Sequence, residues 1–189
     1  MIKNFFLIDL TCDSQFDSSA LQISDITLGK GFLTSLDFYR GSNGVIIASF
    51  DNDKNQINGF CAGRVLDKDS FKKEFGFSFD KSDILGLIDP VCVHPDYQKM
   101  GIGVSLIKEV MSVLKTSIFI TPVWSYINSL GVRTTNAGRS FEKLGFSLED
   151  SSFHSWKEDC NIKFQCPLKN LSADCNCGIN FYVKDNYRL

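Results

Sequence analysis

The segment ILGLIDPVCVHPDYQKMGIGVSLIKEVMSVLK, residues 84–115, decides how the rest of this chain is interpreted. Its first part is apolar and rich in residues that favour β-strands, and the pair His94-Pro95 ends that run. Apolar residues then recur at spacings of three and four, as in an amphipathic helix; they are Ile107, Val110, Met111 and Leu114. The segment therefore predicts a strand, a glycine-containing turn and a helix.

Two glycines, Gly101 and Gly103, stand where the expected helix begins. The first N–H groups of a helix have no partner within it and lie at the positive end of its dipole. Glycine lets a ligand approach such a backbone closely. This arrangement favours the binding of an anion, and of a pyrophosphate in particular. An ordinary turn into a helix is the alternative interpretation.

Two common phosphate-binding motifs do not fit these glycines. A dinucleotide-binding fingerprint has a third glycine where this chain has Leu106. A P-loop has its lysine after the glycines, whereas Lys99 precedes them here. The pattern that remains is Q-x-x-G-x-G, from Gln98 to Gly103.

The composition limits the class of protein. With 189 residues the chain is long enough for a sizeable core, and we expect a single domain over residues 1–189. A net charge of -2, without clusters of lysine and arginine, argues against nucleic acid as a partner. The sequence has no apolar run near the roughly 20 residues that cross a membrane, so we expect no membrane partner. Seven cysteines without an export signal predict a reducing, cytoplasmic setting. We expect a monomer or a homodimer.

The rest of the chain alternates between strand-like and helix-like segments. Further strands are expected at residues 5–10, 44–50, 56–66, 116–124 and 179–185, and one that starts at Phe146. Residues 14–40 predict two short helices joined at Gly29–Gly31, and residues 137–144 predict another helix. Residues 67–83 are expected to form a loop or short helix laid over the core, with a lid over a substrate site as the alternative.

The sequence VCVHPDYQKMGIG, residues 91–103, closely resembles the first signature of the GNAT superfamily of acyl-CoA N-acyltransferases, and SFEKLGF, residues 140–146, resembles its second. The resemblance covers about residues 45–66, 84–150 and 178–187, while the first 40 residues match only in their pattern of elements. It implies an α/β (α+β) fold with a mixed, largely antiparallel twisted sheet. That sheet would be splayed between its fourth and fifth strands and flanked by about four helices.

The resemblance also implies an acetyl-CoA site in the gap of the sheet. The pantetheine arm would pair with the backbone of Val91, Cys92 and Val93. Backbone N–H groups of the loop would hold the pyrophosphate, from Gln98, Lys99, Met100, Gly101, Ile102, Gly103 and Val104. Asn136, two residues beyond the usual asparagine position, is a further candidate for contact with CoA or for capping the helix.

The implied reaction moves an acetyl group from acetyl-CoA to a primary amine by direct attack. The amine has to lose a proton, and Asp89, which precedes Pro90 on the central strand, is the candidate base. The developing oxyanion needs an N–H donor, which the family takes from the backbone, here at Cys92 or Val93. The slight acidity of the chain favours a cationic acceptor.

The expected proton donor to the leaving thiolate is missing from its usual place. The family has a tyrosine there, and this chain has Phe141, which carries no proton to donate. The candidates for this role are Ser140, Tyr126 and a water near Trp124. The departure keeps a second class of function open, a non-catalytic acyl-CoA-binding or sensing module.

A cysteine-bearing segment, about residues 151–178, lies between the last two expected strands, where the family has part of its acceptor site. Four thiolates of this segment could hold a structural zinc ion, those of Cys160, Cys166, Cys175 and Cys177. Their spacing lacks the C-x2-C pair of a zinc knuckle, so four reduced, partly buried cysteines are the alternative. A zinc-braced interaction module is therefore a third class of function.

Overall fold

The computed structural model describes residues 5–51, 56–128, 130–135, 137–152, 163, 165 and 177–186. In these residues eight strands form one sheet in the order β1-β2-β3-β4-β5-β8-β7, and β6 pairs with β5 beside that path. The strands are β1 (Phe5–Asp9), β2 (Gly44–Asp51), β3 (Ile57–Asp67), β4 (Ile84–Val93), β5 (Ile118–Ile127), β6 (Arg133–Thr135), β7 (Ser147–Ser152) and β8 (Gly178–Asp185).

Four α-helices and two single turns of 3-10 helix accompany the strands in the same part of the chain. The α-helices are α1 (Asp17–Thr27), α2 (Lys68–Phe75), α3 (Ile102–Leu114) and α4 (Gly138–Lys143). The 3-10 turns are η1 (Asp37–Tyr39) and η2 (Pro95–Tyr97). No helix among these described residues is long and apolar enough to cross a membrane.

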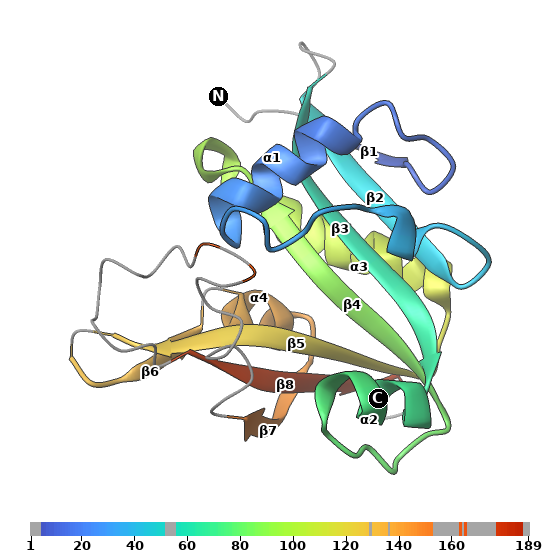
Figure 1. Ribbon diagram of the computed structural model, residues 1–189, viewed down its shortest axis with the longest axis vertical. Helices are drawn as coiled ribbons and strands as arrows, with labels where there is room; N and C mark the ends of the chain where they lie inside the picture. Colours follow the sequence, from blue (N-terminus) through green and yellow to red (C-terminus); the bar gives the residue numbers. More distant parts are fainter. Residues whose placement is uncertain are drawn as a thin grey trace.

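The sheet is closed at one end and open at the other, because β4 and β5 diverge (Figure 1). These two strands are parallel, and in the described chain they pair only at Gly86 with Phe119 and at Leu87 with Ile120. The other paired strands are antiparallel. Beyond Leu87 and Ile120 the two strands form a V, so the expected splay between the fourth and fifth strands is confirmed.

Different helices cover the two faces of β2–β4, and we name the faces after them. Figure 1 shows α1 crossing one face of these strands, the α1 face, while α3 lies behind them on the α3 face. Helix α2 also packs on the α1 face, near the closed end of the V, where Phe71 clusters with Leu85 and Leu87. Helix α4 shares one buried cluster with α3 through Phe141. The open end of the V therefore has α1 on one side, and α3 and α4 on the other.

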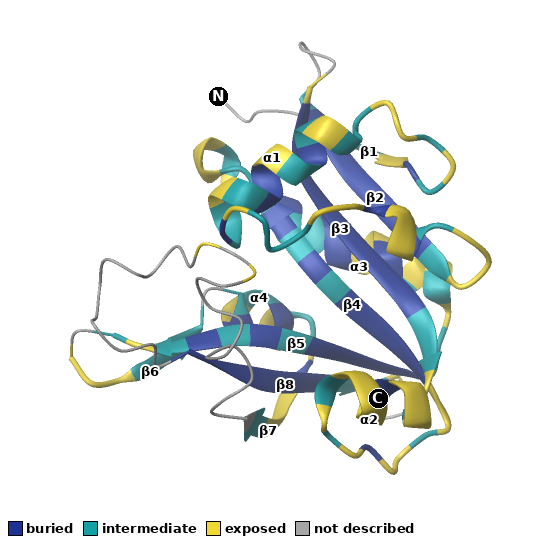
Figure 2. Cartoon of the chain, in the orientation of Figure 1, coloured by how far each residue is buried: buried dark blue, intermediate teal, exposed yellow. Residues whose placement is uncertain are grey.

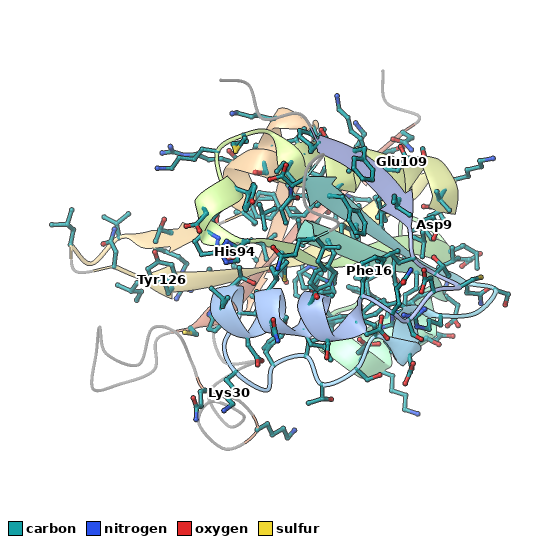
Figure 3. The ribbon with its side chains drawn as sticks, turned by 90° about the horizontal axis from the view of Figure 1, so that it is seen from above. Asp9, Phe16, Lys30, His94, Glu109 and Tyr126 are labelled. Carbon is teal, nitrogen blue, oxygen red and sulfur yellow. The ribbon has the colours of Figure 1, made fainter. Side chains whose placement is uncertain are left out.

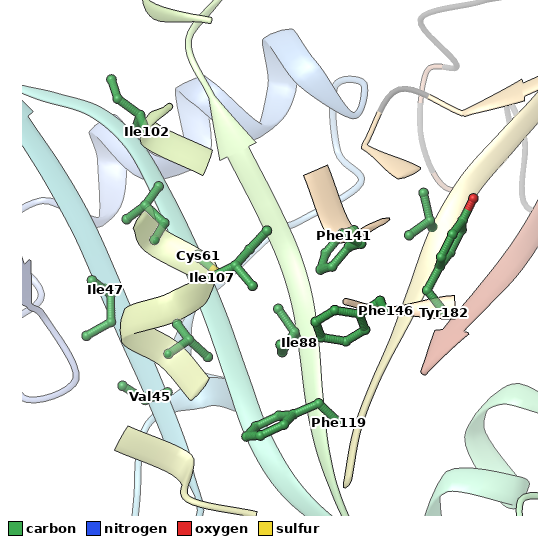
Figure 4. Close-up of a cluster of buried hydrophobic side chains, with 13 residues drawn as sticks. Val45, Ile47, Cys61, Ile88, Ile102, Ile107, Phe119, Phe141, Phe146 and Tyr182 are labelled. Carbon is green, nitrogen blue, oxygen red and sulfur yellow. The ribbon is translucent and has the colours of Figure 1, made fainter. Parts of the chain in front are cut away.

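The central strands consist largely of buried residues (Figure 2), and their side chains form apolar clusters on both faces of the sheet. The expected apolar stripe of α3 is confirmed, and its buried members are Ile102, Leu106, Ile107 and Val110. Figure 4 shows Phe141 and Phe146 between β4 and β5, where both rings belong to the cluster around α3. Their packing supports the two strands at the place where hydrogen bonds between them have ended.

A register shift in β4 decides which of its side chains point to which face. The pairing of β3 with β4 shifts between Cys61 and Gly63, opposite Asp89 and Pro90. Before the shift Leu87 packs on the α1 face, and after it Val91 packs on the α3 face. Because side chains alternate along a strand, an extra residue exchanges the two faces for all residues beyond it. Asp89 follows Leu87 by two residues and therefore belongs to the α1 face.

The prediction of two helices in residues 14–40 is wrong for the second helix. In the described residues from 28 to 51 there is no α-helix, and η1 is a single turn. Gly29 and Gly31 both have positive φ values, 107° and 82°, which interrupt a helix. Further on, the Ser35 hydroxyl accepts a hydrogen bond from the Asp37 N–H at 3.0 Å, a local bond that competes with helical pairing. Strand β6 is another element that the sequence did not predict.

The prediction of a short helix over the core in residues 67–83 is confirmed by α2. Its first turn is capped by Asp67, whose side chain accepts from the Ser70 N–H at 2.8 Å, and Gly76 ends it with a φ of 68°. Phe71 is fully buried and its ring lies 5.9 Å from that of Phe181 on β8. Helix α2 therefore closes the narrow end of the V.

Candidate active site

A cavity of about 700 Å³ occupies the open end of the V. Its walls come from β4, β5, the start of α3, the region of α4 and the end of α1. The cavity therefore passes between the strands and has an α1 side and an α3 side.

The start of α3 forms one end of this cavity. Gly101 is the N-cap, has a φ of 85° and lies where only glycine is unstrained. No side chain caps this helix and its first turn contains no acidic residue. The first N–H groups of α3 thus point outward without a competing carboxylate, as an anion requires.

Most of the residues expected to hold CoA lie on the cavity wall. They are Val91, Val93, Gln98, Lys99, Gly101, Ile102, Gly103 and Val104. Met100 packs instead against the cluster around α3, and Cys92 is fully buried on the α1 face. Asn136 lies outside the described residues. The side-chain amide of Gln98 donates to the carbonyl of Val93 at 3.0 Å and joins the loop to β4.

The backbone of β4 alternates between its neighbour β3 and the cavity. The His94 N–H donates to the carbonyl of Asn58 at 2.9 Å, so it points toward β3. In an antiparallel pair every second residue points the same way. The N–H of Cys92 is thus directed to β3, and those of Val91 and Val93 to the gap. Of the two N–H groups expected at the oxyanion, that of Val93 is the one that faces the gap.

Asp89 is the acidic residue on the described wall of the cavity. Burial raises the pKa of Asp89 from its ordinary value of 3.8 to about 7, with a further rise from the carboxylate of Glu74 and a smaller opposing effect of Arg64. Asp89 as a whole residue is half-buried and lines the cavity wall. A carboxyl group with a pKa near neutrality can take up and release a proton at physiological pH.

The thiol of Cys92 has a different chemistry. Burial raises the pKa of Cys92 to about 12, so the thiol keeps its proton near neutrality. A nucleophilic cysteine needs a thiolate. Cys92 therefore serves as a small buried residue between β4 and α1.

The α1 side of the cavity is mainly apolar. Its wall is formed by Ile26, Thr27, Leu28 and Phe32 near the end of α1, and by Pro122 and Trp124 of β5. The rings of Phe32 and Trp124 are stacked, with centroids 6.2 Å apart and an interplanar angle of 18°. This stack connects the segment after α1 with β5 across the gap. The Gln165 N–H also donates to the carbonyl of Lys30 at 2.9 Å, so the β7–β8 connection reaches the same segment.

The candidates for donating a proton to the thiolate do not all line the cavity. Phe141 lines the cavity, is only 1% exposed and packs edge-on against Phe146 at 5.2 Å. Ser140 is also on the wall. Tyr126 lies outside the cavity wall, near the outer end of β5, where it pairs with Thr134 of β6 (Figure 3).

Some residues of the site were not predicted from the sequence. Phe32, Thr27 and Lys143 line the cavity, and Glu74 acts on Asp89 from α2. Lys143 had a signal, because it belongs to the second signature, SFEKLGF. Phe32 and Glu74 had none, because long-range folding brings them to the site.

The described residues contain no group of three or more cysteine, histidine, aspartate or glutamate side chains arranged to hold a metal ion. Cys177 is buried immediately before β8. Cys160, Cys166 and Cys175 lie outside the described residues, so the zinc hypothesis stays a prediction for that segment.

Comparison with known proteins agrees with this architecture. A family model described as an acetyltransferase (GNAT) domain matches residues 41–148. The chain belongs to the GNAT family of acetyltransferases. No curated protein sequence matches this chain.

Several solved structures share the fold at low sequence identity. Arabidopsis thaliana NAA60, in complex with acetyl-CoA, is 14% identical, with a TM-score of 0.63 over 96% of this chain and 98% of that one. The ribosomal-protein-S18-alanine N-acetyltransferase from Escherichia coli is 15% identical, with a TM-score of 0.62 over 96% and 94%. The IAA acetyltransferase from Bacillus cereus is 10% identical, with a TM-score of 0.60 over 96% and 99%. At these identities the likeness shows a shared fold.

The environment of Asp89 predicts an unusual dependence of stability on pH. Its pKa is raised in the folded state, so the folded protein holds a proton that the unfolded chain has lost, and stability falls as the pH rises from about 4 to about 7. The variant Asp89→Asn carries no such charge. We expect it to exceed the wild type in free energy of unfolding at pH 8, by on the order of 2 kcal/mol, and to match it near pH 4.

Urea denaturation at both pH values measures this difference. The exposed Asp80 provides a matched control, because Asp80→Asn removes a carboxylate that the solvent already hydrates. A variant Asp89→Asn that is no more stable than the wild type at pH 8 would show that the carboxylate is not desolvated.

Proposed function

We propose that this protein transfers an acetyl group from acetyl-CoA to a primary amine by direct attack, with Asp89 as the base. The observation that carries the proposal is the cavity in the splayed sheet, which joins the uncapped start of α3 to the carboxylate of Asp89. One end suits a phosphate-bearing donor and the other suits a base beside an amine. Membership of the GNAT family and the acetyl-CoA bound to NAA60 support the same donor.

The donor half rests mainly on backbone groups. The N–H groups from Gln98 to Val104 would hold the pyrophosphate, and the helix dipole of α3 adds a positive field. The gap-facing groups of Val91 and the carbonyl of Val93 would pair with the pantetheine arm, which leaves the Val93 N–H for the thioester. Lys99 and Lys143, both on the cavity wall, provide positive charge at this end.

In the chemical step the amine nitrogen attacks the thioester carbonyl carbon. Before the attack the substrate ammonium group passes one proton to Asp89, and as the neutral amine attacks, the new N–C bond forms and the C–S bond breaks. The Val93 N–H stabilises the oxyanion, because it faces the gap. The second proton of the nitrogen reaches the CoA thiolate by way of the Ser140 hydroxyl or water, which gives one proton to the sulfur and takes one from the nitrogen, since Phe141 has none to give.

The α1 side of the cavity favours an amine attached to an apolar body. Its described wall combines one carboxylate with apolar side chains, among them Ile26, Leu28, Phe32 and Trp124. The hydroxyl of Thr27 donates its proton to the carbonyl of Ile23 at 2.8 Å. Among the described residues, this side of the cavity offers no second charged group to pair with a second charge on the acceptor, and burial of an unpaired charge is costly.

Substitution of Gly103 tests the donor site. A Cβ at this position would lie 3.7 Å from Val93 Cγ2 and 3.9 Å from Val91 Cγ1, ordinary contact distances directed toward the cavity strand. We expect Gly103→Ala to bind acetyl-CoA within about threefold of the wild type, and Gly103→Val to bind at least about tenfold more weakly, because the larger side chain narrows the site. Isothermal titration calorimetry gives both constants. Equal binding by wild type and Gly103→Val would contradict the assignment.

The acceptor is tested with amines that differ in charge and in their apolar part. We expect 2-phenylethylamine to be acetylated with a kcat/KM at least about tenfold above those of phenylalanine, which adds a carboxylate, and putrescine, which carries a second cation in place of the ring. The variant Trp124→Ala should lose most of this preference and leave ethylamine almost unchanged. Release of the CoA thiol and the mass of the N-acetylated product are measured together.

The amine panel also separates the second class of function. A sensing module would bind acetyl-CoA in the calorimeter and release no CoA thiol with any amine. Equal rates for the three amines would contradict the apolar acceptor while leaving acetyl transfer intact.

The role of Asp89 predicts a pH profile. Because the base must be ionised to accept a proton, kcat/KM should fall about tenfold per pH unit below the pKa of Asp89, near pH 7. The variant Asp89→Asn should be on the order of 100-fold slower and should lack this acidic limb. The exposed-site variant Asp80→Asn is the control. An unchanged profile in Asp89→Asn would remove this residue as the base.

A further inference from the structure

Behind Asp89, on the same face of the sheet, Arg64 and Glu74 form a close ion pair. The Arg64 guanidinium donates through Nη2 to both carboxylate oxygens of Glu74, at 2.6 and 2.5 Å. The Arg64 side chain is only 10% exposed, and its Cζ lies 3.9 Å from the ring centroid of Phe38. A stacked and desolvated guanidinium holds its partner in one geometry. Glu74 is therefore fixed in place although its own side chain is 39% exposed.

The strand register places this pair next to Asp89. Arg64 of β3 is paired with Leu87 of β4, two residues before Asp89. The side chains of Leu87 and Asp89 share the α1 face, because the register shift comes only at Asp89 and Pro90. Glu74 comes from α2, the helix between β3 and β4. The insertion of α2 thus brings a second carboxylate to the face that carries the base.

Neither Arg64 nor Glu74 lines the described cavity wall, so neither is placed to touch a ligand there. Both influence Asp89 electrostatically, in opposite directions, and the effect of the Glu74 carboxylate is larger. The Glu74 carboxylate raises the pKa of Asp89, and Arg64 lowers it.

Arg64, Glu74 and Asp89 form a cluster of charged groups, and other titratable groups face it. Tyr39 of η1 is buried, and burial together with Asp89 raises its pKa, so its hydroxyl keeps its proton. Cys92 of β4 and Cys61 of β3 are buried thiols whose pKa values burial also raises. These three groups are neutral near pH 7, which leaves Arg64, Glu74 and Asp89 as the charges of the cluster.

We propose that Glu74, anchored by Arg64, is a positioning residue that acts through Asp89 and makes it a stronger proton acceptor for the substrate ammonium group. The inference rests on the proposed function, since it takes Asp89 as the base. A carboxylate next to a second carboxylate holds a proton more tightly than it would alone. The substrate ammonium therefore passes one proton to Asp89, which becomes a neutral carboxyl group, while Glu74 stays ionised and paired with Arg64.

The chain offers a matched set of variants for the test. Glu74→Gln removes the charge and keeps the shape, and Glu74→Asp keeps the charge on a shorter side chain. Glu149→Gln is the control, because Glu149 forms an ion pair with Lys81 and does not act on Asp89. Arg64→Met removes the opposing charge. Glu74 is partly exposed, so its variants are expected to fold even where the buried Arg64 does not tolerate change.

Two measurements are made on each variant. Carbon-13 NMR of the aspartate carboxyl groups, assigned with Asp89→Asn, follows the titration of Asp89 without any substrate. The pH profile of kcat/KM for 2-phenylethylamine follows the same group during turnover. We expect Glu74→Gln to lower both midpoints by about one pH unit, and Arg64→Met to raise them. Glu74→Asp should restore most of the wild-type midpoint, and Glu149→Gln should show no shift.

Two outcomes would overturn the inference. The first is an NMR midpoint for Asp89 that is the same in Glu74→Gln and in Glu149→Gln, since Glu74 would then not act on Asp89. The second is an NMR shift without a shift of the kcat/KM profile, since the coupling would then play no part in turnover. Failure of the proposed function looks different, because the profile would then survive Asp89→Asn while the NMR titrations still report on Glu74.

Discussion

The structure depends on the short parallel contact between β4 and β5, which ends after Leu87 and Ile120. Backbone N–H and C=O groups inside a protein are nearly always paired, so a central strand that loses a neighbour needs other partners. Strand β4 keeps β3 on one side and presents its other edge to the cavity. An extended ligand is suited to such an edge, because it can take the place of the missing strand. The loss of a few strand hydrogen bonds thus creates the site.

The register shift opposite Cys61 and Gly63 gives the two sides of the cavity different chemistry. Before the shift, β4 directs Asp89 toward α1, and after it, β4 directs Val91 and Val93 toward α3. Without the extra residue, the carboxylate and these valines would lie on one face. The base would then stand beside the donor and apart from the α1 side, where we place the amine. In the proposed function, one inserted residue therefore separates the two substrates.

The sequence predicted β4, the glycine turn and α3 well because their signals are local. The left-handed Gly101 and the apolar stripe of α3 are properties of neighbouring residues. The segment from Ser14 to Arg40 was predicted poorly, because distant contacts determine its path. The Arg40 guanidinium donates to the carbonyls of Leu10 and Thr11 at 2.9 and 3.0 Å, across about thirty residues of chain. No window of local periodicity contains such bonds.

On the α1 side of the cavity, the electrostatics could not be predicted from the sequence either. Asp89 could be chosen from the sequence as an acid on a central strand, but its chemistry depends on Glu74, Arg64 and burial, which only the fold brings together. These surroundings also act against stability, because an ionised carboxylate loses hydration and faces a second carboxylate. The close packing of α2 supplies compensating apolar burial at the same end of the sheet. The helix that brings in the unfavourable charge thus also brings in the phenylalanines that offset it.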